Sequence, residues 1–414
     1  MDYKHFDAKD TVLENGLRVV TIKKNTNIVS INCGIKIGAI DEEENEKGLA
    51  HFIEHMLFKG TKHRDNERLN EELELLGGDY NAYTDYTCTV YSITVLKEEF
   101  KKSVELLSDM IINSTFPKKE IVREREVVLA ELSSSNDDIE DYSFKMINKI
   151  AYEKNPIKYD IIGERKSIKK FTQDFALKFY HRYYVPNNSV IVIASSMEHN
   201  DVLNIVKYNF SHWNYKEIQR KKCFLERNKS LKKISYKNNV EQSTITYLYN
   251  FYNLSKDEEL ALRVLNHRLG ESANSILFRE LREKRGLAYD VYTHLDTTHQ
   301  IKTLYIYTAV KDKSIEEAIN IIDDCINGIT NGSIDINEKA LILMKKVMKT
   351  AITLTVEDSA DLSSYVLHQC LEEEDKFEFK QDMEKLEILN KQQIYDVAVK
   401  VLQNPTIHIL KPRK

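Results

Sequence analysis

Two histidines and one glutamate lie close together in the first sixty residues and could bind a metal ion and move a proton. His51, Glu54 and His55 have the spacing H-x-x-E-H, in a run that is typical of a helix from Gly48 to Phe58. Spacings of three and four residues place all three side chains on one helical face. Two imidazoles one turn apart can bind one zinc ion, and a neighbouring carboxylate can take a proton from the bound water. With 12 histidines and 65 acidic residues among 414, chance gives at most roughly 0.05 copies of this inverted zinc-binding motif.

A third ligand is expected from the helix predicted over 118–132, which follows Pro117 in the sequence. Glu124 and Glu131 are seven residues apart, so they lie about 20° from each other around that helix and share a face. Glu126 lies about 140° from Glu131, and Glu120 lies about 16 Å from Glu131 along the axis. Helical geometry therefore selects Glu124 and Glu131 as candidates and does not decide between them.

The segments around these residues predict the elements that position them. Strands are expected at 18–23, 28–37 and 80–95, since β-branched and aromatic residues are dense there. An amphipathic helix is expected at 97–112. The acidic run 41–46 is interpreted as a solvated loop that leads into the metal-binding helix.

The second half of the chain repeats features of the first half. Tyr-Asp-Val-Tyr-Thr at 289–293 matches Tyr-Asn-Ala-Tyr-Thr at 80–84, and each begins a strand-like run followed by an amphipathic helix. An internal duplication is the economical interpretation. The predicted organisation is an N-terminal catalytic module at 1–215, a linker at 216–232 that is rich in Lys and Arg, and a homologous C-terminal module at 233–414.

The second module is expected to lack a metal site. The helix predicted at 257–269 occupies the place of the H-x-x-E-H helix but carries only one histidine, His267. A single histidine on a helix is more often a structural polar contact than a ligand. We therefore expect one zinc ion per chain.

Composition and charge exclude several classes of function. A formal charge of -5 with interspersed acids and bases gives no reason to expect a nucleic-acid partner. No run of eighteen apolar residues exists, so we expect no membrane span. The five cysteines are scattered and form no C-x-x-C pair, and the first ten residues resemble neither a signal nor a transit peptide. A cytoplasmic protein with reduced thiols is expected.

Five motifs, in order along the chain, resemble the pitrilysin-type (insulinase-type, M16) zinc metallopeptidases. Within that family the chain is most similar to the short bacterial branch that is related to the mitochondrial processing peptidase. The motifs are Gly48-Leu-Ala-His-Phe-Ile-Glu-His-Met-Leu-Phe-Lys-Gly60, Gly78-Asp-Tyr-Asn-Ala-Tyr-Thr84, Arg123-Glu-Arg-Glu-Val-Val-Leu-Ala-Glu-Leu132, Ile162-Gly163 with Tyr184-Val-Pro-Asn-Asn188, and Leu281-Arg-Glu-Lys-Arg-Gly-Leu-Ala-Tyr289. Each match alone is moderate, and five in order are very specific.

This resemblance implies roles for the metal-site residues. His51, His55 and Glu131 would be the zinc ligands, and Glu54 would be the general base. Glu124 would be a second carboxylate that holds a histidine ligand, as metal sites usually require.

The resemblance also implies residues that bind the substrate. The strand with Asn81 and Ala82 would pair with the substrate backbone as an added edge strand. Arg282 and Tyr289 would close on the substrate and stabilise the oxyanion. The structural alternatives are an Arg282 that forms salt bridges within a charged helix and a Tyr289 that belongs to the core.

The implied fold is α+β, with two similar modules that each consist of a mainly antiparallel sheet covered by helices. This is a LuxS/metallohydrolase-like duplication, and one chain would supply half of a clamshell. The implied activity is zinc-dependent endopeptidase cleavage of peptides or unfolded segments inside a dimeric chamber, with zinc-bound water as the nucleophile. A homodimer is expected. The alternatives are a processing subunit that acts on one leader peptide in a heterodimer with an inactive homologue, and a catalytically silent structural subunit.

Overall fold

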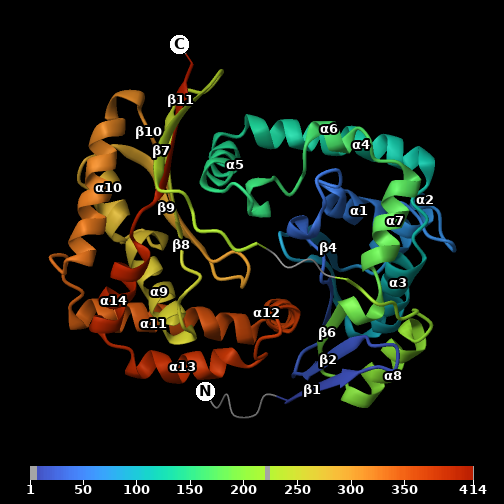
Figure 1. The fold of residues 1–414 in the computed structure, drawn as a ribbon. Coiled ribbons are helices and arrows are strands. Elements are labelled where there is room, and N and C mark those ends of the chain that lie inside the picture. Colours follow the sequence, from blue (N-terminus) through green and yellow to red (C-terminus); the bar gives the residue numbers. More distant parts are fainter. Residues whose placement is uncertain (1–6, 220–223, 414) are drawn as a thin grey trace. The chain divides into compact units, whose positions relative to one another are not determined.

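Each half of the protein is organised around one mixed β-sheet (Figure 1). The structure, a computed structural model, describes residues 7–219 and 224–413. The first unit contains Met1–Ser133, Tyr159–Lys222 and Ile352–Glu378, and the second contains Ser134–Lys158, Cys223–Ala351 and Phe379–Lys414. The strands of the first unit are β1 (Asp7–Val12), β2 (Arg18–Lys23), β3 (Ile28–Ile35), β4 (Asp79–Thr84), β5 (Thr89–Leu96) and β6 (Ser189–Ser195). Those of the second are β7 (Leu231–Lys237), β8 (Ser243–Asn250), β9 (Ala288–Asp296), β10 (Thr303–Val310) and β11 (Thr406–Pro412).

Helices cover both sheets. Those that lie mostly in the first unit are α1 (Leu49–Leu57), α2 (Asn66–Glu74), α3 (Phe100–Asn113), α4 (Lys118–Asp137), α6 (Arg165–Ile168), α7 (Gln173–Tyr183), α8 (His199–Phe210) and α12 (Ser359–Leu371). The others are α5 (Ile139–Ala151), α9 (Lys256–Asn266), α10 (Ile315–Thr330), α11 (Glu338–Glu357), α13 (Glu378–Ile388) and α14 (Lys391–Val401). Two π-helical turns, η5 (His267–Glu271) and η6 (Phe278–Glu283), follow α9. No helix among the described residues combines the length and the apolar character that a membrane crossing needs.

The two sheets have the same strand order, which confirms the duplication that the sequence predicts. The first sheet has the order β1-β2-β6-β3-β5-β4, and the second has β7-β11-β8-β10-β9. When β1 is left out of the comparison, each strand of the first sheet corresponds to one strand of the second sheet. Among the described residues, the only parallel pairs are β2 with β6 and β7 with β11, and they occupy the same place in the two sheets. The α+β class with two similar, mainly antiparallel modules is therefore confirmed.

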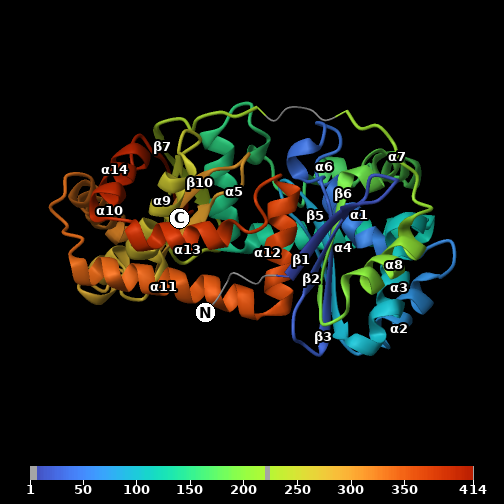
Figure 2. The ribbon, with the colours of Figure 1, turned by 90° about the horizontal axis from the view of Figure 1, so that it is seen from below.

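The first sheet is buried on both faces. Strand β6 is buried along its whole length, as expected for a central strand between two layers. Helices α3 and α8 pack together on one side, and α12 lies along β6 and β3 on the other (Figure 2). Val192 and Leu367 belong to the core beneath α12, whereas Ile31 and Phe52 belong to the core of the opposite face.

The observed units differ from the expected division of the chain in two helical segments. Residues 134–158, with α5, lie in the second unit, and residues 352–378, with α12, lie in the first. Helix α5 packs against β8 and β11, while α10 and α14 lie on the other side of that sheet (Figure 1). The expected linker 216–232 is also shorter, since β7 begins at Leu231, and its residues 220–223 lie outside the described part of the chain. An amphipathic pattern shows that a helix buries one face but does not show against which sheet.

Candidate metal centre

Helix α1 carries three of the proposed site residues, and the residue that precedes it must be glycine. Gly48 caps the helix with a φ of 92°, a left-handed conformation that glycine adopts without steric cost. A Cβ atom at this position would lie 2.3 Å from the carbonyl oxygen of Ile162. Burial of Phe52, Ile53 and Met56 fixes the apolar face of the helix against the core.

A buried carboxylate fixes the start of the same helix. The side chain of Glu42 accepts hydrogen bonds from the backbone N–H groups of Gly48 at 2.9 Å and Ala50 at 2.7 Å. These donors have no partner within the helix. Burial raises the pKa of Glu42 to about 8, although the two backbone hydrogen bonds oppose that shift. The interpretation of 41–46 as a solvated loop was therefore wrong for Glu42, and Glu46 is buried as well.

The structure brings His51, His55 and Glu131 together. One potential ligand atom from each residue lies within 4.8 Å of the others. Nε2 of His51 is 3.5 Å from Oε1 of Glu131, and Nε2 of His55 is 3.6 Å from Oε2. Ligand atoms around a tetrahedral zinc ion are about 3.4 Å apart, given metal–ligand distances near 2.1 Å. Two imidazoles and one carboxylate at these separations fit zinc with one coordination position left for water.

Glu124 contacts the opposite nitrogen of a histidine in this cluster. Its Oε2 atom lies 3.2 Å from Nδ1 of His55, and its Oε1 atom lies 2.9 Å from Nζ of Lys59. The side chain of Glu124 is only 7% exposed. Burial works against its negative charge, but the hydrogen bonds from His55 and Lys59 outweigh it and lower the pKa of Glu124. The contact leaves Nε2 of His55 to face Glu131, which is the arrangement that a metal ligand and its supporting carboxylate require.

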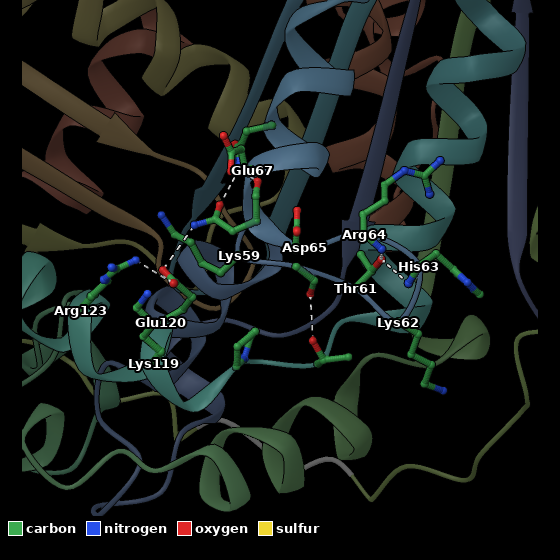
Figure 3. A pocket seen from close by; sticks show the side chains of 15 residues that line it. Lys59, Thr61, Lys62, His63, Arg64, Asp65, Glu67, Lys119, Glu120 and Arg123 are labelled. Carbon is green, nitrogen blue, oxygen red and sulfur yellow. Dashed lines mark hydrogen bonds and ion pairs between the residues drawn. The ribbon is translucent and has the colours of Figure 1, made fainter.

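Lys59 lines a broad basin of the first unit and also contacts Glu124, which lies beside His55. The basin has a volume of about 1010 Å³ and is formed by the segment after α1 and the start of α4. Figure 3 shows Lys59 on the same side of it as Glu120 and Arg123, which form an ion pair of 2.9 Å. On this side of the basin Glu120 pairs with Arg123, and Lys59 pairs with Glu124.

Glu54 is oriented by a residue that the sequence analysis did not select. The hydroxyl group of Thr84 donates a hydrogen bond of 2.7 Å to Oε2 of Glu54. Thr84 is the last residue of β4, and it ends the Asn-Ala-Tyr-Thr motif that contains Asn81 and Ala82. Strand alternation places Thr84 on the same face as Ala82. This period of two residues could have identified Thr84 from the sequence.

Strand β4 lies at an edge of the first sheet, and β5 is its only partner in the described part of the chain. Asn81 is exposed and Ala82 is partly buried. The backbone N–H group of Ala82 donates to the side-chain oxygen of Asn81 at 2.9 Å. The N–H group of Ala82 therefore already has an acceptor, the side chain of Asn81, which an added strand would have to displace.

The remaining two predicted residues lie together in the second unit. Arg282 belongs to η6, and Tyr289 is at the start of β9, the edge strand that corresponds to β4. The guanidinium carbon of Arg282 lies 5.4 Å from the ring centre of Tyr289 and 4.8 Å from that of Phe278. Tyr289 is 77% exposed, so the alternative of a core tyrosine is wrong. Lys284 and Arg285, not Arg282, make the salt bridges of this segment, both to Glu280.

Fold and cluster together define a duplicated α+β protein with an H-x-x-E-H helix and a possible metal site. Residues 18–165 match the family model for insulinase (peptidase family M16), and residues 170–346 match the model for the peptidase M16 inactive domain. An "uncharacterized zinc protease" of Rickettsia felis is 30% identical over 356 residues, which are 84% of this chain and 84% of that protein. The chain belongs to peptidase family M16.

Two further proteins show how far the similarity extends. The mitochondrial-processing peptidase subunit beta of Rattus norvegicus is 36% identical over 206 residues, which cover 49% of this chain and 42% of that subunit. The crystal structure of a protease from Helicobacter pylori superposes with a TM-score of 0.92 over 99% of this chain and 100% of that one, at 22% sequence identity. The last comparison supports the fold alone.

Proposed function

We propose that the protein is a zinc-dependent endopeptidase that binds one zinc ion per chain through His51, His55 and Glu131. The observation that supports this most directly is the convergence of these three side chains, with Glu54 on the same helix. The presence of the complete set argues against a catalytically silent structural subunit. Membership of a family in which relatives are named zinc proteases agrees with the proposal.

The chemistry assigned to each residue follows from its contacts. Bound zinc would lower the pKa of a water molecule and polarise the scissile carbonyl group. Glu54 takes a proton from the attacking water and passes it to the leaving amine. Thr84 keeps the carboxylate of Glu54 in place through its hydrogen bond. Glu124 orients His55, with Lys59 opposing the cost of burying its negative charge.

The substrate backbone is proposed to add to the free edge of β4. Asn81 and Ala82 would then exchange their mutual hydrogen bond for bonds to the peptide. Arg282 and Tyr289 are proposed to donate hydrogen bonds to the oxyanion that forms at the attacked carbonyl. The contact between the two side chains supports a joint role.

We further propose that two chains face each other as a homodimer and enclose short or unfolded peptides. A heterodimer with an inactive homologue, acting on one leader peptide, is the main alternative. The similarity to the beta subunit of a mitochondrial processing peptidase favours that alternative enough for it to be tested. Sedimentation of the purified chain, alone and at several concentrations, distinguishes a self-associating chain from one that stays monomeric without a partner.

The test of the activity compares the unaltered chain with Glu54→Gln, Glu131→Gln and Glu126→Gln. Glu126 is exposed on the same helix as Glu131 and is the matched control. We expect zinc in the unaltered, Glu54→Gln and Glu126→Gln proteins, and cleavage of a quenched unstructured peptide only by the unaltered chain and Glu126→Gln.

Each other outcome has a definite meaning. Zinc without cleavage by the unaltered chain would point to a missing partner or a single precursor substrate. Absence of zinc from the unaltered chain, prepared without chelator, would refute the metal site. Retention of zinc by Glu131→Gln would refute the assignment of the third ligand.

A further inference from the structure

A second, smaller cavity lies in the second unit, far along the chain from the metal ligands. It has a volume of about 200 Å³ and lies between η5, the loop that follows it and the first turns of α11. Its polar lining consists of His267, Arg268, Ser272, Asn274, Asn337 and Lys339. No carboxylate lines it, and the rest of its wall is formed by apolar side chains of α11. The lining thus offers hydrogen-bond donors and positive charge beside an apolar surface.

The positive charge at this cavity lacks an acidic partner. In the described part of the chain, neither Arg268 nor Arg279 forms an ion pair. Burial and the nearby charge of Arg279 lower the pKa of Arg268. One hydrogen bond, from Arg268 to the backbone oxygen of Asn274 at 2.7 Å, holds the loop. Part of the guanidinium group therefore has a structural role, but its charge is not compensated by this bond.

His267, the single histidine of the second-half helix, faces the same cavity. It begins the π-helical turn η5, and such turns occur often at functional sites. Its Nδ1 atom is buried and has no hydrogen-bond partner among the described residues. Burial and the charge of Arg268 lower the pKa of His267. A neutral imidazole can donate one N–H to a ligand, and a buried ring nitrogen without a partner is unfavourable.

The first turn of α11 contributes a further positive end. The side chain of Asn337 accepts from the backbone N–H group of Ala340 at 2.9 Å, so the helix begins at the cavity. Helix α11 has 20 residues, and the N-terminus of such a helix favours an anion. The unpaired arginine, the imidazole and this helix terminus come from separate segments and meet at one place.

We propose that this cavity binds a small ligand with a phosphate or carboxylate group, held by Arg268, His267 and Lys339, with any apolar part against α11. The proposal goes beyond the peptidase activity and does not depend on it. A planar guanidinium group suits both kinds of oxyanion. The lack of any lining carboxylate would exclude cations.

Calorimetric titration of the full chain at fixed ionic strength tests the proposal with three probes. Inorganic phosphate and hexanoate represent the two sources of the oxyanion, and hexanol represents the apolar part alone. We expect millimolar or tighter binding of phosphate, hexanoate or both, and at least about tenfold weaker binding to Arg268→Met. Lys339→Gln, a change at an exposed position, should weaken the same binding. This variant keeps the test decisive if Arg268→Met fails to fold.

Lys346→Gln is the matched control. It removes the same charge from α11, seven residues further on, on the same side and about 10 Å along the axis. Binding of hexanoate only would identify a carboxylate ligand, and binding of phosphate only would identify a phosphate ligand. The proposal is overturned if neither anion binds, if hexanol binds as tightly as hexanoate, or if Arg268→Met and Lys339→Gln bind like Lys346→Gln. None of these results bears on zinc binding or peptide cleavage.

Discussion

Replacement of Thr84 by valine tests whether strand β4 orients the proposed general base. The substitution keeps the branched shape and removes the hydroxyl group that donates to Glu54 at 2.7 Å. A hydrogen bond to a charged group contributes about 1.5–3 kcal/mol. If this energy is realised in the transition state, kcat falls about 10- to 150-fold. KM should change little, because Thr84 is not proposed to contact the substrate.

The assay is steady-state cleavage of a quenched peptide, together with a measurement of bound zinc. Zinc content should stay at the level of the unaltered chain, since Thr84 is not one of the proposed ligands His51, His55 and Glu131. Thr84→Ser keeps the hydroxyl group and should recover most of the activity. A Thr84→Val protein with full zinc and full kcat would refute the positioning role. Equal losses in the serine and valine variants would show that the methyl group, not the hydroxyl group, matters.

Three further predictions concern the charged groups of the first unit. Lys59→Met removes the cation beside Glu124, so zinc affinity should fall about 10- to 100-fold in chelator competition; unchanged affinity would contradict the link. Arg64→Met leaves three carboxylates without their guanidinium group, one of them buried, and should cost about 3–5 kcal/mol in urea unfolding, with Arg64→Lys in between. Hydrogen bonding to Lys102, and then to Arg64, lowers the pKa of Glu72 from 4.5 to about 2 although burial opposes it. Stability from Glu72 is thus complete above about pH 4.5 and lost as pH falls toward 2, and Glu72→Gln should flatten that part of the pH profile of unfolding.

The convergence of His51, His55 and Glu131 could be predicted from the sequence because its main part is local. The spacing of His51, Glu54 and His55 on one helix depends only on helical geometry. Glu124 and Glu131 could not be separated in this way, because both lie on the same face of α4. Their tertiary placement separates them: Glu124 is the more buried and faces Nδ1 of His55 and Lys59, whereas Glu131 faces the two Nε2 atoms.

The sequence patterns did not predict the burial of acidic residues or the sheet against which each helix packs. The acidic run 41–46 has the composition of a solvated loop, yet Glu42 is buried because the first N–H groups of α1 need an acceptor. The segments 134–158 and 352–378 contain the helices α5 and α12, but the pattern of a helix does not state which sheet receives its apolar face. Long-range packing decides both cases, and periodicity within one segment carries no information about it.

Strand β4 links the proposed binding of the substrate to the proposed activation of water. Tyr80, Ala82 and Thr84 alternate toward the face that carries α1, where Thr84 reaches Glu54. Tyr83 points to the opposite face, where its hydroxyl group lies 2.7 Å from Nε2 of His368 on α12. A shift of one residue in the pairing with β5 would exchange these faces and break both contacts. If a peptide adds to the edge at Asn81 and Ala82, it therefore binds to the same rigid strand that holds the base, and the position of the scissile bond is set relative to Glu54 by the register of β4.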